Sequence, residues 1–239
     1  MKVIEKLKKK AENIHFEPPV AIAFLGDSVT QGCFDVYMKC EDRLETYFDA
    51  ENAYHTKVRK ILNMLFPKAP LSIINAGISG GCAIDGAERV ERDVLRFSPD
   101  LCVVCFGLND SSLIDIETYK KSIAEIFDKL LKENIEVIFM TPNMMCSNVS
   151  CHIKEPYIRD FAERISKTQN DGKLEEFLQA AKEIAKSRNI PVCDCYNKWK
   201  MLAENGVNTT ELLSNYINHP TAEMNWLFAY SLVETMFKN

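Results

Sequence analysis

Four short polar motifs, distant from one another in the chain, hold the residue types that serine-dependent ester hydrolysis requires. They are "GDSVTQG" with Ser28, "GISGG" with Gly80, "GLND" with Asn109 and "INHP" with His219. Such chemistry needs a nucleophilic hydroxyl, a base that takes its proton, and donors aimed at the developing oxyanion. Ser28 would be the nucleophile and His219 the base. The donors would be the backbone N–H groups of Ser28 and Gly80 and the side-chain amide of Asn109.

Each motif alone also has a purely structural interpretation. Asp27 and Ser28 could cap a helix that follows a strand. Asn109 could belong to a turn, and His219 could be an ordinary loop histidine. Because all four motifs occur in one chain, we favour the catalytic interpretation. We expect Asp27 and Asn75 to be structural residues that fix turns through hydrogen bonds.

Two rival residues stay open at this point. The stretch "GISGG" fits the G-x-S-x-G pattern of a nucleophile elbow, which would make Ser79 the nucleophile. That elbow needs several strands before it and an HGGG-type oxyanion loop, and the sequence has neither. His152 lies in a loop after the fourth predicted strand. It could contact substrate or replace His219 as the base, or it could be an exposed loop histidine.

The elements that must position these motifs are predicted by hydrophobic pattern. Apolar runs rich in β-branched residues predict five strands, at 20–25, 71–76, 101–106, 135–140 and 190–195. Their continuous apolar character is typical of a parallel sheet covered on both faces. Helical spacing predicts helices at about 52–66, 86–97, 116–131, 155–168, 173–188 and 221–237. This alternation indicates one α/β domain over residues 1–239, a doubly wound three-layer α/β/α sandwich.

Two segments lie outside this alternation. Residues 1–19 are expected to form an N-terminal helical extension, in which the basic run "EKLKKK" is the solvated face of a short helix. Residues 33–50 are expected to form a loop insertion near the site, with aromatic side chains that could make one wall of a pocket.

The four polar motifs each follow a predicted strand or precede the last predicted helix. Since ligands bind outside the carboxyl ends of parallel strands, we expect these motifs to meet at one edge of the sheet. With the motifs in this order, the chain resembles the GDSL-type, or SGNH, hydrolases over residues 20–230. The resemblance implies a flavodoxin-like fold with strand order 2-1-3-4-5, the residue roles given above, and a serine mechanism without metal or cofactor. The context of "GDSVTQG" and "INHP" is most similar to the carbohydrate-esterase-like branch.

One position departs from the pattern of that family. The family usually carries an aspartate three residues before the histidine, where this chain has Tyr216. In serine proteases, loss of the corresponding charge costs about 10⁴-fold in turnover. Asn215 is a possible third member, and a backbone carbonyl could also orient the ring. We therefore expect a Ser28–His219 dyad whose activity rises through the ordinary pKa of histidine, roughly 6 to 7.

Composition restricts the partners. The formal net charge of −5 gives no basic surface for nucleic acid. Residues 2–20 lack the apolar run of a signal peptide, and no stretch approaches the ~20 apolar residues of a membrane span. The nine cysteines are expected to be reduced thiols and not zinc ligands. We expect a cytoplasmic protein that takes a small-molecule ester and binds neither nucleic acid nor membrane; the oligomeric state is not readable from the sequence.

Together these features predict a serine esterase that hydrolyses a short-acyl ester, such as the acetyl ester of a carbohydrate, through an acyl-enzyme on Ser28. A short acyl chain is expected because no long apolar segment suited to a lipid is evident. Two alternatives remain. One is a thioesterase or lysophospholipase-type acylhydrolase, and the other is a catalytically weak homologue that binds a ligand and lacks the triad aspartate.

Overall fold

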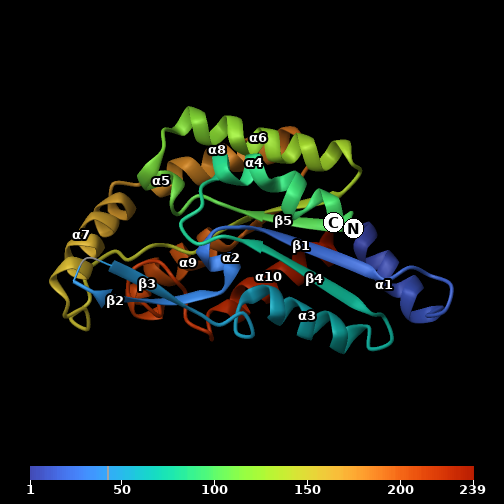
Figure 1. Cartoon of the computed structure of the whole chain (residues 1–239), viewed down its shortest axis with the longest axis horizontal. Helices are drawn as coiled ribbons and strands as arrows, with labels where there is room; N and C mark the ends of the chain where they lie inside the picture. Colours follow the sequence, from blue (N-terminus) through green and yellow to red (C-terminus); the bar gives the residue numbers. More distant parts are fainter. Residues whose placement is uncertain (42) are drawn as a thin grey trace.

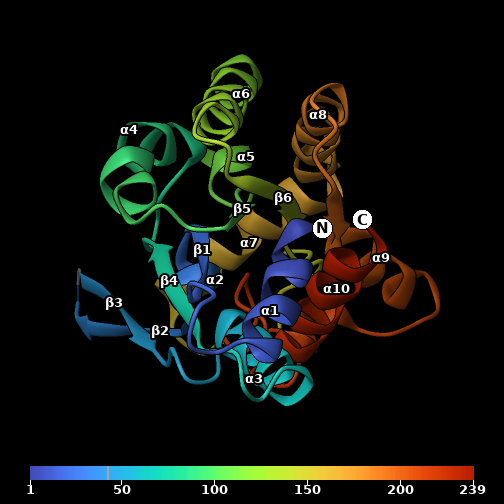
Figure 2. The ribbon, with the colours of Figure 1, turned by 90° about the vertical axis from the view of Figure 1, so that its right-hand side faces the viewer.

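The computed structural model describes residues 1–41 and 43–239. These residues form three layers, with a parallel sheet between two layers of helices (Figure 1). The sheet strands are β1 (Val20–Gly26), β4 (Leu71–Gly77), β5 (Leu101–Cys105), β6 (Glu136–Thr141) and β7 (Val192–Asp194). Helices α1 (Lys2–Glu12), α3 (Tyr54–Leu65) and α10 (Asn225–Lys238) cover one face, and α4 (Ala83–Asp93), α6 (Ile116–Lys132) and α8 (Lys173–Ser187) cover the other (Figure 2).

The strands follow the order β4-β1-β5-β6-β7, and all neighbours are parallel. In order along the chain this is 2-1-3-4-5, so the predicted doubly wound fold is confirmed. The register aligns the ends of the three strands that precede the first three motifs, because Gly26 lies opposite Gly77 on one side and Cys105 on the other. The polar motifs after these strands therefore begin at one level of one sheet edge.

Burial explains why these segments form strands and helices. Every residue of β5 is buried, as a central parallel strand requires. Helix α6 buries a stripe at helical spacing that includes Tyr119, Ile123 and Phe127. Its start is fixed by Asp115, whose side chain accepts a hydrogen bond from the Thr118 backbone N–H at 2.9 Å.

The expected loop insertion at 33–50 contains regular structure. It forms an antiparallel hairpin of β2 (Cys33–Cys40) and β3 (Arg43–Phe48), with Asp35 opposite Tyr47 and Tyr37 opposite Glu45. The sequence pattern hides these strands because both faces of the hairpin mix polar and aromatic residues, so no clean alternation marks them. The hairpin extends beyond the carboxyl ends of the sheet strands, beside α7 (Pro156–Asn170) (Figure 1).

Several element boundaries differ from those predicted. The fifth strand is shorter than 190–195, because Asp194 caps a helix that the hydrophobic pattern did not reveal, α9 (Cys195–Glu204). Helix α4 begins three residues before the predicted 86, where Asp85 accepts a hydrogen bond from the Cys82 N–H at 2.8 Å. Lys10, expected on a solvated face, is buried and donates to the backbone carbonyls of Ile14 and Glu17.

Short helices complete the polar edge: α2 (Ser28–Gln31) follows β1 and α5 (Asp110–Leu113) follows β5. Two 3₁₀ turns cover Leu95–Phe97 and Thr209–Leu212. Among the described residues, none of the helices has both the length and the apolar character needed to cross a membrane.

Candidate active site

Ser28 lies on the tight turn between β1 and α2. Asp27 caps α2 by accepting a hydrogen bond from the Val29 N–H at 3.0 Å, which leaves Ser28 as the first residue of the helix. At that position its backbone N–H has no acceptor within the helix. The turn also requires Gly26, because a Cβ there would lie 2.6 Å from the carbonyl oxygen of Cys105. The predicted structural role of Asp27 agrees with this geometry.

His219 reaches Ser28 from the other end of the chain. Its Nε2 lies 2.9 Å from the Ser28 Oγ, and both residues are buried. The loop that carries the histidine is closed by a bridge between Leu213 and Pro220 and by the Ser214 N–H, which donates to the His219 carbonyl at 2.7 Å. The structure thus brings the proposed nucleophile and base into direct contact.

Asn215 occupies the other side of the imidazole. Its Nδ2 lies 3.1 Å from His219 Nδ1, where the family pattern would place a carboxylate oxygen. Tyr216, at the usual aspartate position, has a φ of 57° and packs its ring away from this contact, stacked on His152 with centroids 5.1 Å apart. The residue that contacts Nδ1 is therefore a neutral amide.

The two remaining oxyanion-hole candidates lie on the loops that flank Ser28. Gly80 has a φ of 78°, a backbone conformation that L side chains rarely adopt, and no acceptor for its N–H is found among residues 1–41 and 43–239. The Asn109 side chain donates to the Gly81 carbonyl at 3.0 Å, which ties the two loops together. One amide hydrogen of Asn109 remains for another acceptor.

A buried carboxylate holds these loops in place. Asp110 accepts hydrogen bonds from the backbone N–H groups of Ala83 at 2.7 Å and Gly107 at 2.8 Å. Burial raises the pKa of Asp110 to about 6, although these hydrogen bonds oppose the shift. Burial likewise raises the pKa of Asp27 to about 7, and the charge of Asp110 adds to that increase.

Burial has the opposite effect on the candidate base. It lowers the pKa of His219 from 6.5 to about 4, and a hydrogen bond with the Phe34 backbone opposes part of this change. The expectation of a transition near pH 6 to 7 used the ordinary value of histidine and is therefore wrong for this ring. The sequence could not reveal the difference, because the burial arises from residues distant in the chain.

The structure separates the rival residues from the Ser28–His219 contact. The Ser79 N–H donates to Gln31 Oε1 at 2.7 Å, and the ring nitrogens of His219 contact Ser28 and Asn215 instead of Ser79. His152 is exposed and faces Glu211, with 3.8 Å between Nε2 and Oε2. Neither rival is placed in contact with the histidine that meets Ser28.

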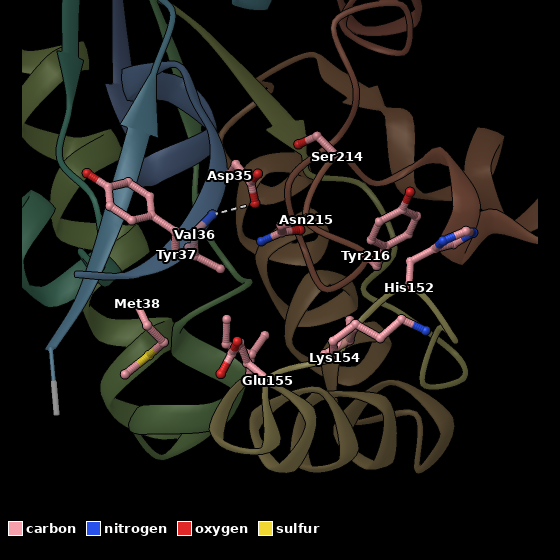
Figure 3. Close-up of a pocket in the computed structure, with 12 residues that line it drawn as sticks. Asp35, Val36, Tyr37, Met38, His152, Lys154, Glu155, Ser214, Asn215 and Tyr216 are labelled. Atoms are coloured by element: carbon pink, nitrogen blue, oxygen red, sulfur yellow. Dashed lines mark hydrogen bonds between the residues drawn. The ribbon is translucent and has the colours of Figure 1, made fainter. Parts of the chain in front are cut away.

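A cavity of about 440 Å³ adjoins the site (Figure 3). Its walls are the β2 strand, the loop that leads into α7, and the segment Ser214–Tyr216, and they include Asp35, His152 and Glu155. Asn215 lies between this cavity and His219. The aromatic segment that the sequence placed near the site contributes Tyr37 to the wall of this cavity.

Sequence reasoning missed two buried residues that support the site. Arg89 of α4 donates to the carbonyl oxygens of Gly26 at 2.8 Å and Ala76 at 2.6 Å, joining the ends of β1 and β4. Asn143 donates to the Asn218 carbonyl at 2.9 Å. Neither stands in a recognisable motif, so no local signal could have identified them. Asn75 fixes its turn as predicted, by accepting from the Gly77 N–H at 3.0 Å.

The described residues contain no group of three or more His, Cys, Asp or Glu side chains placed to hold a metal ion. Cys193 and Cys195 lie together, with 3.7 Å between their sulfur atoms.

Comparison with known families gives a match to the model of the GDSL-like Lipase/Acylhydrolase family over residues 24–227. The chain belongs to this family. The matched range includes all four motifs, from Ser28 to His219. No curated protein matches the chain.

Solved structures of low sequence identity share the fold. A two-domain esterase (CEX) active on acetylated mannans is 20% identical with a TM-score of 0.68, covering 99% of this chain and 52% of that chain. This chain thus spans about half the length of that esterase. A catalytic mutant of Axe2, an acetylxylan esterase from Geobacillus stearothermophilus, is 18% identical with a TM-score of 0.68, covering 90% and 93% of the two chains. The lipase/acylhydrolase from Enterococcus faecalis is 22% identical with a TM-score of 0.65, and the match covers 90% of this chain and 94% of that chain.

Proposed function

We propose that this GDSL-family protein is a serine esterase that forms an acyl-enzyme on Ser28, with His219 as the base. The observation that carries the proposal is the 2.9 Å contact between Ser28 Oγ and His219 Nε2 at the carboxyl edge of the sheet. That distance lies within the range that proton transfer requires.

The reaction follows from these positions. Ser28 Oγ attacks the ester carbonyl carbon while its proton passes to His219 Nε2. The N–H groups of Ser28 and Gly80 and the free amide hydrogen of Asn109 donate to the oxyanion of the tetrahedral intermediate. His219 then returns the proton to the leaving alcohol. Water, deprotonated by the same ring, attacks the acyl carbon, and the ring returns that proton to Ser28 Oγ as the bond from Ser28 to the acyl group breaks and the acid is released.

We propose a short acyl group, with acetyl as the first choice, on a carbohydrate alcohol. Two of the similar structures are described as esterases of acetylated mannans or xylan. The adjoining cavity has both polar and aromatic side chains, among them Asp35, Tyr37 and Glu155, which suits a hydroxyl-rich molecule better than a lipid chain.

A panel of acetyl, butyryl and octanoyl esters, assayed beside acetylated xylan and mannan oligosaccharides, tests this substrate class. The highest kcat/KM is expected for an acetylated oligosaccharide. A preference for octanoyl or thioester substrates would favour the lysophospholipase or thioesterase alternative instead.

A second candidate, a ligand-binding protein with little turnover, is favoured by one observation: the amide of Asn215 replaces a carboxylate beside His219. Labelling with a fluorophosphonate separates the two candidates. An esterase becomes labelled on Ser28, whereas a binding protein stays unlabelled. The Ser28→Ala variant is the negative control for labelling in either case.

A further inference from the structure

We infer that Asn215 is a positioning residue that holds neutral His219 in the tautomer with its proton on Nε2, so that the resting Ser28–His219 pair is in the unproductive form. The inference rests on the proposed function for its catalytic consequence. It predicts that the Asn215 amide limits the turnover of this esterase, and that the Asn215→Asp substitution raises kcat.

The first step is the orientation of the Asn215 amide. Its Oδ1 accepts hydrogen bonds from three successive backbone N–H groups, those of Ile217, Asn218 and His219, each at 3.0 Å. Turning the amide over would place an NH₂ group against three buried donors, which is strongly unfavourable. The oxygen therefore faces the backbone, and Nδ2 faces the imidazole.

The second step concerns the hydrogens on that nitrogen. Nδ2 lies 2.9 Å from Asn218 Oδ1 and 3.1 Å from His219 Nδ1, so each of its two hydrogens has an acceptor. An amide nitrogen donates and does not accept. His219 Nδ1 must therefore accept, and in a neutral imidazole the proton then resides on Nε2.

The third step is the effect on Ser28. In this tautomer Nε2–H points at Ser28 Oγ, 2.9 Å away, and donates to it. The ring then has no lone pair available for the serine proton, although the mechanism requires one. The doubly protonated ring is disfavoured as well, because burial lowers the pKa of His219 to about 4.

The Phe34 backbone forms a hydrogen bond with the His219 ring that raises its pKa and so opposes part of the effect of burial. Catalysis then depends on the fraction of rings that exchange the proton from Nε2 to Nδ1. In the serine-protease triad, the change from Asp to Asn acts through the same wrong tautomer and costs about 10⁴-fold.

The structure can accommodate the carboxylate. In an Asn215→Asp variant, one oxygen retains the three backbone hydrogen bonds and the other faces Nδ1. The Asn218 amide must turn so that its NH₂ donates to that oxygen, which its half-exposed position permits. The expected result is a kcat increase of roughly 10- to 10⁴-fold, the upper end being the reverse of the protease loss, with little change in KM. Asn63→Asp, an exposed change on α3, is the matched control for added charge and should leave kcat unchanged.

Nitrogen-15 NMR of histidine-labelled protein tests the tautomer directly and needs no activity. The His219 signals are those lost in His219→Gln. In the unaltered protein at neutral pH, Nε2 should carry the proton and Nδ1 should not. In Asn215→Asp the proton should move to Nδ1, and the pKa of the ring should rise.

A proton on Nδ1 of the unaltered protein would overturn the inference, whether or not the variant folds. So would a folded Asn215→Asp variant that is no faster than the original on an ester that the original hydrolyses. If neither protein hydrolyses any ester and Ser28 resists fluorophosphonate, the proposed function fails, while the NMR result still decides the tautomer.

Discussion

Ser28 Oγ and His219 Nε2 lie 2.9 Å apart although 191 residues separate them in the sequence. The contact exists because β1 delivers the serine to the sheet edge and the Leu213–Pro220 bridge holds the histidine above it. The proposed nucleophile and the proposed base are thus fixed by two independent parts of the fold.

Replacement of Ser28 by alanine should remove esterase activity, with a loss on the order of 10³-fold or more, because among residues 1–41 and 43–239 Ser28 supplies the only hydroxyl placed against a ring nitrogen of His219. Ser79→Ala is the matched control, since Ser79 follows the neighbouring strand and is bound through its backbone to Gln31. Hydrolysis of a chromogenic acetyl ester measures both. Full activity in Ser28→Ala would show that the nucleophile is misassigned.

The pH profile should reflect the buried imidazole. With its pKa lowered to about 4, His219 is neutral at pH 5 and above. The plot of kcat/KM against pH should therefore rise through about pH 4, without a histidine transition between 6 and 7. Circular dichroism at the same pH values serves as a control for acid unfolding. Asp27 and Asp110 also have raised pKa values, of about 7 and about 6. A transition near pH 6.5 that persists in both Asp27→Asn and Asp110→Asn would contradict the burial of the ring.

Asp27 should make the protein less stable as the pH rises. Its pKa in the folded protein is about 7, above the ordinary 3.8, so between these values the folded state retains a proton that the unfolded chain has lost. Stability therefore falls as the pH increases from about 4 to 7. Asp27→Asn removes this dependence, and its melting temperature relative to the original should rise from pH 5 to pH 8. An unchanged difference across that range would be inconsistent with a raised pKa.

Gly80→Ala should reduce activity more than stability. Both Gly80 and Gly172 have a left-handed backbone, with φ of 78° and 75°, and a Cβ at either would meet nothing within 4 Å. Each substitution should cost about 1 kcal/mol of folding stability through backbone strain. Gly80→Ala should also lower kcat, because its N–H is a proposed oxyanion donor, whereas Gly172→Ala should not. Equal kcat values in the two variants would remove Gly80 from the oxyanion hole.

The parallel sheet and the approach of the four motifs to one edge were predictable, because continuous apolar runs and strand-end motifs are local features of the sequence. Other features depend on contacts between distant segments. The hairpin over 33–48 lacks a clean alternation, and α9 begins at a cap within an expected strand. The lowered pKa of His219 comes from burial, which no local pattern reports. Asn215 could be named as a candidate, but the direction of its amide is set by backbone groups of a folded loop.

The β2–β3 hairpin leaves the body of the protein directly after α2 and returns where the Asp49 N–H donates to the Gly32 carbonyl at 2.8 Å. Its two ends thus meet at one point, four residues after Ser28, while the stretch Asp35–Met38 of β2 forms a wall of the cavity. Changes in the length or sequence of the hairpin can therefore alter which alcohols fit, without moving the serine or shifting the register of the sheet. Substrate choice and bond cleavage in this chain can evolve separately.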